Sequence, residues 1–183
     1  MPLNPLASPV PSGSTSRLTI VPLAEVHAEA LFEGFADPRV YEFIPEQAPE
    51  TKEAYQQEVR RLVGGPLPAD LDLALNWAVM ENTSGTWVGT LQASGFKDGT
   101  LWIGYKFSPA VWGRGVATEA VLWLVQELQR NQGATQIFAS VDSRHLASLG
   151  VVTRVGFAKI RTEVSSLHGQ TTEDVILCWA APS

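Results

Sequence analysis

The chain has 183 residues, of which 45% are hydrophobic and 17% are charged, a composition that suits one globular domain with a full core. The formal net charge of −6 argues against a nucleic-acid-binding protein, because such a surface needs a basic patch to neutralise phosphates. The acidic excess is compatible with a cationic partner such as an amine, although it also simply aids solubility.

The first sixteen residues hold four prolines and four serines, and they have neither a basic start nor an apolar centre. This composition predicts a flexible tail over residues 1–16 rather than a signal peptide, followed by a single domain over residues 17–183. No apolar run approaches the roughly 18 residues of a membrane span, so we expect no membrane partner.

A strand, two helices and three more strands are predicted for the first half of the domain. The segment "RLTIVPL" (17–23) alternates like a strand, and "AEVHAEALFEGFA" (24–36) has helical spacing up to an Asp-Pro pair. Residues 49–65 form a second predicted helix, which a Gly-Gly pair ends. Three strands joined by the hairpin turns "TSG" and "FKDG" are then predicted over 74–82, 86–94 and 99–108.

The second half begins with a glycine-containing turn and an apolar helix that "RNQG" ends. The apolar stripe of this helix consists of Val116, Ala117, Ala120, Val121, Leu124, Val125 and Leu128. A buried strand (134–141), a short helix (143–156) and two last strands, "FAKIRTEVS" and "TTEDVILCWAA", complete the order βααβββαβαββ. A meander followed by β-α-β units implies an α/β fold, with a mixed sheet and helices on its faces.

The only cysteine, Cys178, lies in the apolar run "VILCWAA". A lone cysteine cannot form an internal disulfide, which favours a reducing, cytoplasmic location, and we interpret Cys178 as a buried small hydrophobe. The three histidines, His27, His145 and His168, have no metal-binding spacing with it, so no metal site is expected.

The stretch "VWGRGVATEA" (111–120) places two glycines around an arginine, directly before the apolar helix. It lacks the Lys-Ser or Lys-Thr of a nucleotide P-loop. As a dinucleotide fingerprint it lacks the third glycine, and it follows a hairpin instead of the first strand of a βαβ unit. Two interpretations remain. The glycines make only a tight turn, or they bare a helix N-terminus for a diphosphate whose amide-containing arm pairs with a free strand edge, as in coenzyme A.

Residues 112–117 resemble the [Q/R]-x-x-G-x-[G/A] signature of the GNAT acyl-CoA N-acyltransferases. "WGRGVATEA" is similar to the RimJ/RimL-like branch, which acetylates the N-termini of ribosomal proteins and related amines. Three more segments resemble that branch in the same order: "RLTIVPL" with "DPRVYEFIP", "LWIGYKFSPAVWG", and "DSRHLASLGVVTRVGF". The resemblance spans residues 17–180 and implies a GNAT-like fold with a splayed parallel pair of strands, and acetyl-CoA as cofactor.

The resemblance also implies which residues hold acetyl-CoA. Backbone amides of the turn and the helix start are expected to bind the pyrophosphate, and the Arg114 side chain to add its charge unless it is only a solvated loop residue. The residues of this signature are Trp112, Gly113, Arg114, Gly115, Val116, Ala117 and Thr118. The backbone of Tyr105, Lys106 and Phe107 is expected to pair with the pantetheine amides. Ser148 is expected to donate a hydrogen bond to the departing thiolate.

Two departures from the family pattern concern catalysis. Three residues before Ser148 the family usually has an asparagine, whereas this chain has His145. This histidine either steers the pantetheine or relays a proton, or it is only a half-exposed residue at a helix start. Just before "IGY" the branch often has a glutamate, whereas this chain has Trp102. The obvious general base is therefore missing, and Trp102 is expected to line the acceptor groove instead.

Glu42, Tyr105 and His145 are the remaining candidate bases, and Glu42, which is also expected to contact the acceptor, lies where the family's substrate loop usually runs. Glu81 is interpreted as a solvated hairpin charge. The expected reaction is direct attack of a neutral amine on the acetyl thioester, with the Phe107 N–H meeting the developing oxyanion. Without a strong base, an α-amine with a pKa of about 8 is a better acceptor than a lysine amine at about 10.4.

The acceptor stays open between a protein N-terminus and a small-molecule amine such as an antibiotic. Because Trp102 replaces the family glutamate, a non-catalytic acyl-CoA-binding or sensing module is the alternative function. The resemblance adds a homodimer as an expectation, since C-terminal strands often pair between subunits in this family.

Overall fold

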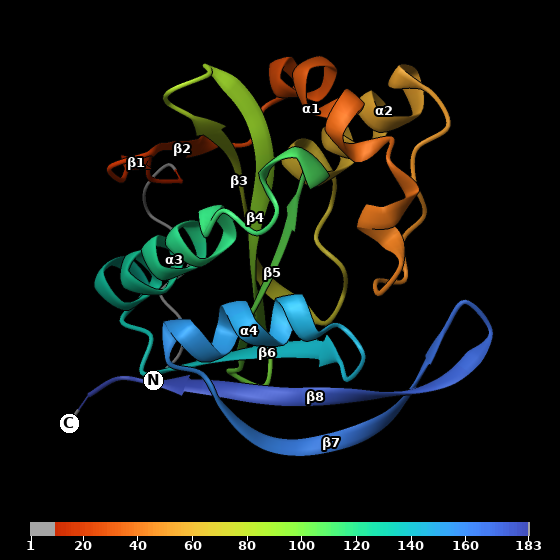
Figure 1. Ribbon diagram of the computed structural model, residues 1–183. Helices are drawn as coiled ribbons and strands as arrows, with labels where there is room; N and C mark the ends of the chain where they lie inside the picture. Colours follow the sequence, from red (N-terminus) through yellow and green to blue (C-terminus); the bar gives the residue numbers. More distant parts are fainter. Residues whose placement is uncertain (1–9, 183) are drawn as a thin grey trace.

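The computed structural model describes residues 10–182, which form one mixed sheet with helices on both faces (Figure 1). The spatial order of the strands is β1-β2-β3-β4-β5-β6-β8-β7. Their bounds are β1 (Gly13–Ser14), β2 (Leu18–Pro22), β3 (Leu71–Glu81), β4 (Thr86–Phe96), β5 (Leu101–Phe107), β6 (Gln136–Asp142), β7 (Ala158–Leu167) and β8 (Gln170–Ala180). The α-helices of this described range are α1 (Ala28–Phe35), α2 (Lys52–Gly64), α3 (Val116–Gln132) and α4 (Leu146–Val155), and none of them is long and apolar enough to cross a membrane.

The predicted order βααβββαβαββ is confirmed from β2 to β8, and the mixed α/β fold with it. Some boundaries differ from the prediction by a few residues. The helix α2 begins after Thr51, because the Thr51 hydroxyl accepts a hydrogen bond from the N–H of Ala54 at 3.1 Å, and not at Pro49. The predicted helix 24–36 begins with a separate 3-10 turn, η1 (Glu25–His27).

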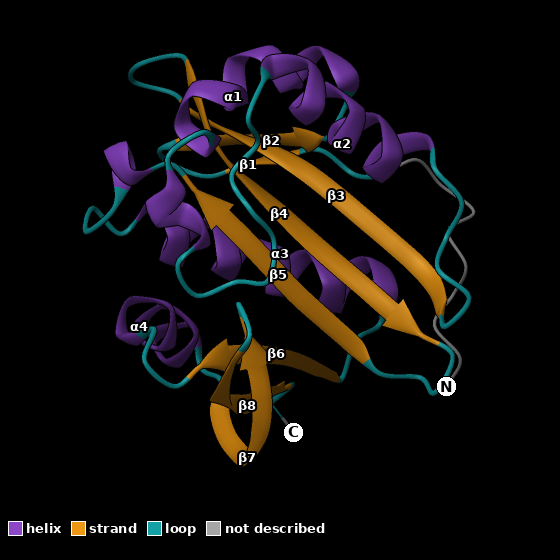
Figure 2. Cartoon of the chain, turned by 90° about the vertical axis from the view of Figure 1, so that its right-hand side faces the viewer, coloured by secondary structure: helices purple, strands orange, loops and turns teal. Residues whose placement is uncertain are grey.

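The strands β5 and β6 are the parallel pair of the sheet, and they are joined at one point only. Trp102 pairs with Phe138 near the start of both strands, and no later pair of residues in the described chain joins them. The two strands therefore diverge toward their C-terminal ends (Figure 2). The splayed parallel pair that the family resemblance implies is confirmed, and it leaves backbone groups on the facing edges free.

Helices cover both faces of the sheet (Figure 2), and each face has its own hydrophobic core. On one face, α3 and α4 cover a large cluster that includes Trp77, Leu124 and Val152. On the other face, α1 and α2 cover a smaller cluster that includes Phe35 and Tyr55. Because strand residues alternate between faces, neighbouring residues of β5 contact different sets of helices.

Residues 10–16 are packed on the domain, so the prediction of a flexible tail over residues 1–16 is wrong for this part; residues 1–9 lie outside the described residues. The strand β1 pairs antiparallel with β2, and the indole N–H of Trp77 donates a hydrogen bond to the carbonyl of Pro11 at 2.8 Å. A Cβ at Gly13 would lie 2.3 Å from the indole nitrogen of Trp123, so only glycine permits this approach. A segment rich in proline and serine resembles a linker in composition, but backbone pairing holds it here.

Candidate active site

The glycine turn before α3 is exposed and held in a conformation that favours glycine. Gly113 and Gly115 have φ values of +71° and +75°, in the left-handed region. A Cβ at Gly113 would meet no atom within 4 Å, and a Cβ at Gly115 would meet only the Arg17 Nη2 at 3.5 Å. Both the conformation and the open approach therefore depend on the missing side chains.

The start of α3 presents unpaired backbone donors. The N–H of Glu119 donates the first helical hydrogen bond, to the carbonyl of Gly115 at 3.1 Å. Within residues 10–182, no partner is found for the N–H groups of the three preceding residues, Val116, Ala117 and Thr118. With the positive end of the helix dipole, these donors form a site that suits a diphosphate.

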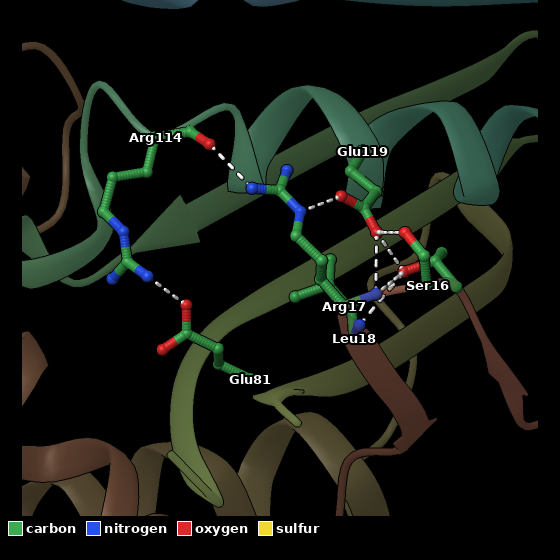
Figure 3. Close-up of polar contacts among 7 residues, drawn as sticks. Ser16, Arg17, Leu18, Glu81, Arg114 and Glu119 are labelled. Atoms are coloured by element: carbon green, nitrogen blue, oxygen red, sulfur yellow. Dashed lines mark hydrogen bonds and ion pairs between the residues drawn. The ribbon is translucent and has the colours of Figure 1, made fainter. Parts of the chain in front are cut away.

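The Arg114 side chain is paired with a carboxylate of the protein. Its Nη2 lies 2.5 Å from Oε1 of Glu81 (Figure 3). The other carboxylate oxygen of Glu81, Oε2, accepts a hydrogen bond from the Ser84 hydroxyl at 3.0 Å. Glu81 is only 8% exposed, so its interpretation as a solvated hairpin charge is wrong. The hairpin lies beside the turn across the sheet, a proximity that chain order does not show. The Arg114 charge is thus balanced by Glu81, and its expected contact with a phosphate stays a prediction.

The free edge of β5 is defined by its hydrogen bonds to β4. The N–H of Ser108 donates to the carbonyl of Val88 at 2.8 Å, and the β4–β5 register continues without a shift to the start of β5. Because backbone groups alternate along a strand, the N–H of Lys106 also faces β4, whereas those of Tyr105 and Phe107 face β6. The carbonyl of Phe107 also points away from β4, since it accepts a hydrogen bond from the Trp112 indole N–H at 2.8 Å.

The expectation that the Lys106 backbone pairs with pantetheine therefore does not fit the register, whereas that for Tyr105 and Phe107 does. The Lys106 side chain lies on the face covered by α1 and α2. Its Nζ is 3.5 Å from a carboxylate oxygen of Glu58 and 5.5 Å from the ring centre of Tyr41. The sequence reasoning missed Glu58, although its place beside the inward-facing Tyr55 on α2 was a usable signal.

Tyr105 and Ser148 form a pair at the opposite face of β5. Their hydroxyl oxygens are 2.7 Å apart, and the Tyr105 hydroxyl also lies 3.2 Å from the Ser148 carbonyl. Burial raises the pKa of Tyr105 to about 12, although the hydrogen bond with Ser148 acts in the opposite direction. Tyr105 therefore keeps its proton at neutral pH and acts as a donor, which argues against its expected role as a base.

His145 lies one helical turn before Ser148, under the segment that precedes α2. The rings of His145 and Phe43 are stacked with centres 4.7 Å apart, so this segment is held on the start of α4. Burial lowers the pKa of His145, while the charges of Asp142 and Glu42 act in the opposite direction. The structure thus brings together three predicted residues, His145, Ser148 and Glu42, from distant parts of the chain.

Trp102 lies apart from this group, at the closed end of the β5–β6 pair. Its ring centre is 5.3 Å from that of Phe138, and its indole N–H donates to the Thr100 hydroxyl at 2.9 Å. Trp102 shares a strand face with Lys106, and the Tyr105 side chain lies on the other face. The tryptophan is half-buried, and its expected contact with the acceptor stays a prediction.

Comparison with known protein families identifies the family of this chain. A family model described as an acetyltransferase (GNAT) domain matches residues 17–158. The chain belongs to the GNAT acetyltransferase family. It is an enzyme of the N-acetyltransferase type with acetyl-CoA as its cofactor.

Individual relatives of this GNAT acetyltransferase are distant in sequence. The FsC-acetyl coenzyme A-N(2)-transacetylase of Aspergillus fumigatus is 24% identical over 169 residues, which cover 83% of this chain and 67% of that protein. A ribosomal-protein alanine acetyltransferase of Vibrio fischeri has a TM-score of 0.77 at 18% identity, with 92% of this chain and 96% of that chain covered. RimJ of Mycobacterium smegmatis, in complex with CoA-disulfide, has a TM-score of 0.76 at 17% identity, with 90% and 82% covered. These structures share the fold and are consistent with the RimJ/RimL-like resemblance.

The residues of this GNAT acetyltransferase fit the cofactor. A Cβ at either glycine of the turn would project into space that protein atoms leave open or nearly so, which suits the close approach of a pyrophosphate. The free N–H groups of Tyr105 and Phe107 suit an extended chain with amide groups, such as pantetheine. The paired hydroxyls of Tyr105 and Ser148 suit a leaving thiolate that needs a hydrogen-bond donor.

Proposed function

We propose that this enzyme transfers the acetyl group of acetyl-CoA to a primary amine, by direct attack of the amine on the thioester. The observation that carries the proposal is the free edge of β5, where the N–H groups of Tyr105 and Phe107 face the divergent strand β6. The Tyr105–Ser148 pair lies next to this edge. A free edge with proton donors beside it suits the binding and activation of an acyl group.

The residues of the chain divide the work as follows. The amides of the glycine turn and the α3 start hold the pyrophosphate of acetyl-CoA, which supplies an activated acetyl thioester. The N–H of Phe107 donates a hydrogen bond to the thioester carbonyl oxygen as negative charge develops there. The hydroxyl of Ser148, supported by Tyr105, donates to the sulfur as it leaves.

His145 is the group we assign to removal of the acceptor proton. Because burial lowers its pKa, the imidazole is neutral near pH 7 and able to accept a proton. The carboxylate of Glu42 acts on His145 electrostatically and is available to bind the acceptor as an ammonium. Glu42 lies beside Phe43 on the segment before α2, and His145 lies at the start of α4. The stack of Phe43 on His145 joins these two parts of the chain.

The acceptor is an α-amine or another weakly basic amine. Making an α-amine neutral at pH 7 costs about 1 kcal/mol, whereas a lysine amine costs about 4–5 kcal/mol. A single imidazole base is sufficient to deprotonate an α-amine at this cost of about 1 kcal/mol. Binding both reactants in one site compensates for weak acid-base catalysis. The names of two similar proteins, an N(2)-transacetylase and a ribosomal-protein alanine acetyltransferase, point to nitrogen acceptors of this kind.

The location is part of the same proposal. We expect the enzyme in the cytoplasm, where acetyl-CoA is formed and thiols stay reduced. The one cysteine, Cys178, is a free thiol that is half-buried on β8 and not fully buried as the sequence suggested.

The acceptor is tested with matched peptides at pH 7, following CoA release and the mass of the product. We expect acetylation of a peptide with a free N-terminus or of a small weakly basic amine. The same peptide with a blocked N-terminus and an internal lysine is the control, and we expect no acetylation of it. Preference for the lysine peptide, or no acetylation of any amine by an enzyme that binds CoA, would contradict the proposal.

A further inference from the structure

Arg17 connects the N-terminal segment to the glycine turn, and nothing in the site described so far gives it a role (Figure 3). Its Nε lies 2.6 Å from Oε2 of Glu119, and its Nη1 donates to the carbonyl of Arg114 at 2.9 Å. Its Nη2 lies 3.5 Å from the position that a Cβ at Gly115 would take. One guanidinium thus contacts the turn, the first turn of α3, and the open side of Gly115.

The negative charge of Glu119 at the start of α3 needs a cationic partner such as Arg17 if an anion is to bind there. Glu119 is an acidic residue in the first turn of α3, where its charge favours the helix itself. The same charge repels a diphosphate that binds to the neighbouring amides, because like charges a few ångströms apart interact strongly in a partly buried site. Partial burial acts to raise the pKa of Glu119, but hydrogen bonds from Thr15 and Arg17 outweigh it and lower the pKa, so the carboxylate is ionised at neutral pH.

Arg17 has a guanidinium nitrogen that its hydrogen bonds leave available. Arg114 is held by Glu81 on the hairpin side of the turn. In the part of the chain that the structure describes, Nη2 of Arg17 makes no hydrogen bond, and it lies on the side of Gly115 where a side chain is absent. The guanidinium geometry permits one more donor contact without loss of the existing two.

We propose that Arg17 is a positioning residue for the pyrophosphate of coenzyme A. It fixes the carbonyl of Arg114 so that the turn stays open, and it cancels the charge of Glu119 beside the bound anion. The backbone around it is fixed as well, since the Glu119 carboxylate accepts hydrogen bonds from the Thr15 hydroxyl and, at 3.2 Å, from the Arg17 N–H. The segment 13–17, which sequence composition assigned largely to a tail, is therefore part of the cofactor site.

The test compares a ligand that carries the pyrophosphate with one that lacks it. For Arg17→Met we expect the Kd of CoA, measured by calorimetry, to rise about 10- to 100-fold, the effect of losing charge-assisted hydrogen bonds. We expect kcat/KM with S-acetylpantetheine, which has no pyrophosphate, to stay within about twofold. The matched control is Arg161→Met, which removes a similar pair with Glu163 on β7 and should change neither quantity.

Two further variants separate charge from geometry. Arg17→Lys keeps the charge without the two-sided contact, so we expect a smaller rise in the Kd of CoA. Adding Glu119→Gln to Arg17→Met removes the unbalanced carboxylate, so we expect part of the CoA affinity to return. An unchanged Kd in Arg17→Met, an equal loss with S-acetylpantetheine, or no recovery in the double variant would overturn the proposal. Because CoA binding is measured without an acceptor, this outcome is independent of the proposed amine substrate.

Discussion

Two hydroxyl groups, those of Tyr105 and Ser148, share one hydrogen bond although 43 positions separate the residues. Ser148 has only one proton, and it is free to donate to sulfur when the Tyr105 hydroxyl donates to Ser148 Oγ. The raised pKa of Tyr105, about 12, keeps that second proton in place at any physiological pH. The two residues should therefore act as one unit and not as two independent groups.

For Ser148→Ala we expect kcat to fall about 100-fold with an unchanged Kd for CoA, because the lost donor acts on the leaving sulfur. For Tyr105→Phe we expect a smaller fall in kcat. The double variant should have the same kcat as Ser148→Ala, because the effects of two residues that act as one unit do not add. Steady-state kinetics at saturating acceptor measure this, with the exposed Ser166→Ala as control. Losses that multiply in the double variant would show that the two hydroxyls act separately.

The neutral imidazole of His145 has a consequence for stability. Because burial lowers its pKa, the unfolded chain binds this proton at a higher pH than the folded chain does. The stability contribution is therefore complete above the ordinary value of 6.5 and is lost as the pH falls below it. We expect the Tm of the wild-type protein, relative to that of His145→Gln, to fall between pH 7 and pH 5. A relative Tm that rises over this interval would mean that Asp142 and Glu42 control the imidazole instead.

Among the elements, the turn that starts α3 depends most directly on glycine. A valine at Gly115 must adopt a φ of +75°, which costs about 1–2 kcal/mol, and its side chain would occupy the space of the pyrophosphate. Gly133, at the other end of α3, is a matched control, because its φ is +63° and a Cβ there meets no atom within 4 Å. We expect Gly115→Val and Gly133→Val to lose similar stability in urea unfolding. Only Gly115→Val should lose CoA binding in calorimetry, and equal affinities would refute the assignment of the turn.

The same elements show what the sequence can and cannot predict. Helical and alternating periodicities identify every α-helix and strand from β2 to β8, because most of these elements bury one side of themselves. The exception is β7, whose residues are almost all exposed. The glycine turn is predictable for a similar local reason, since Gly113 and Gly115 stand directly before an apolar helix, where glycines suit both a tight turn and an open helix start. The strand β1 is not predictable in this way, because backbone pairing with β2 and the contact of Gly13 with Trp123 hold it in place. Neither feature gives a periodic pattern in the sequence.

The register of β5 and the pair of Arg114 with Glu81 lie beyond the sequence for a different reason. Lys106 stands between two residues whose N–H groups face β6. Its own N–H faces β4, because the register of β4 against β5 decides which backbone groups pair, and only the folded sheet fixes this register. Glu81 ends a predicted hairpin strand, and nothing in chain order places it 2.5 Å from a residue 33 positions later. Long-range contacts of this kind determine the electrostatics of the site.

Over the whole molecule, the sheet joins three distant segments at the divergence of β5 and β6. The β5 edge supplies the backbone donors, α4 supplies His145 and Ser148, and the start of α3 supplies the anion site. The segment before α2 adds Phe43 and Glu42 through its stack on His145. Beyond this point the chain continues into the β7–β8 hairpin (Figure 1), most of whose β7 residues are exposed. The turn of this hairpin lies against the 3-10 helix Pro38–Tyr41, where His168 Nε2 is 3.1 Å from the carbonyl oxygen of Tyr41.

The strand β7 is an edge of the sheet, and it carries two exposed apolar side chains. These are Ile160 and Val164, which are 48% and 79% exposed, and Arg161 and Glu163 form an ion pair between them along the strand. An exposed edge strand with apolar side chains is a surface that favours association. We propose this edge as the interface of the expected homodimer, in which two copies of the β7–β8 hairpin cover these side chains.

We expect light scattering after size-exclusion chromatography to give the mass of two chains, and Val164→Lys to shift the protein toward the mass of one. The matched control is Val26→Lys, since Val26 is also 79% exposed but lies on the 3-10 turn η1, away from the edge. CoA affinity should survive in both variants, because β7 contributes no group to the turn or to the β5 edge. A wild-type protein with the mass of one chain, or a dimer that Val164→Lys leaves intact, would show that the exposed apolar side chains of β7 do not join two copies.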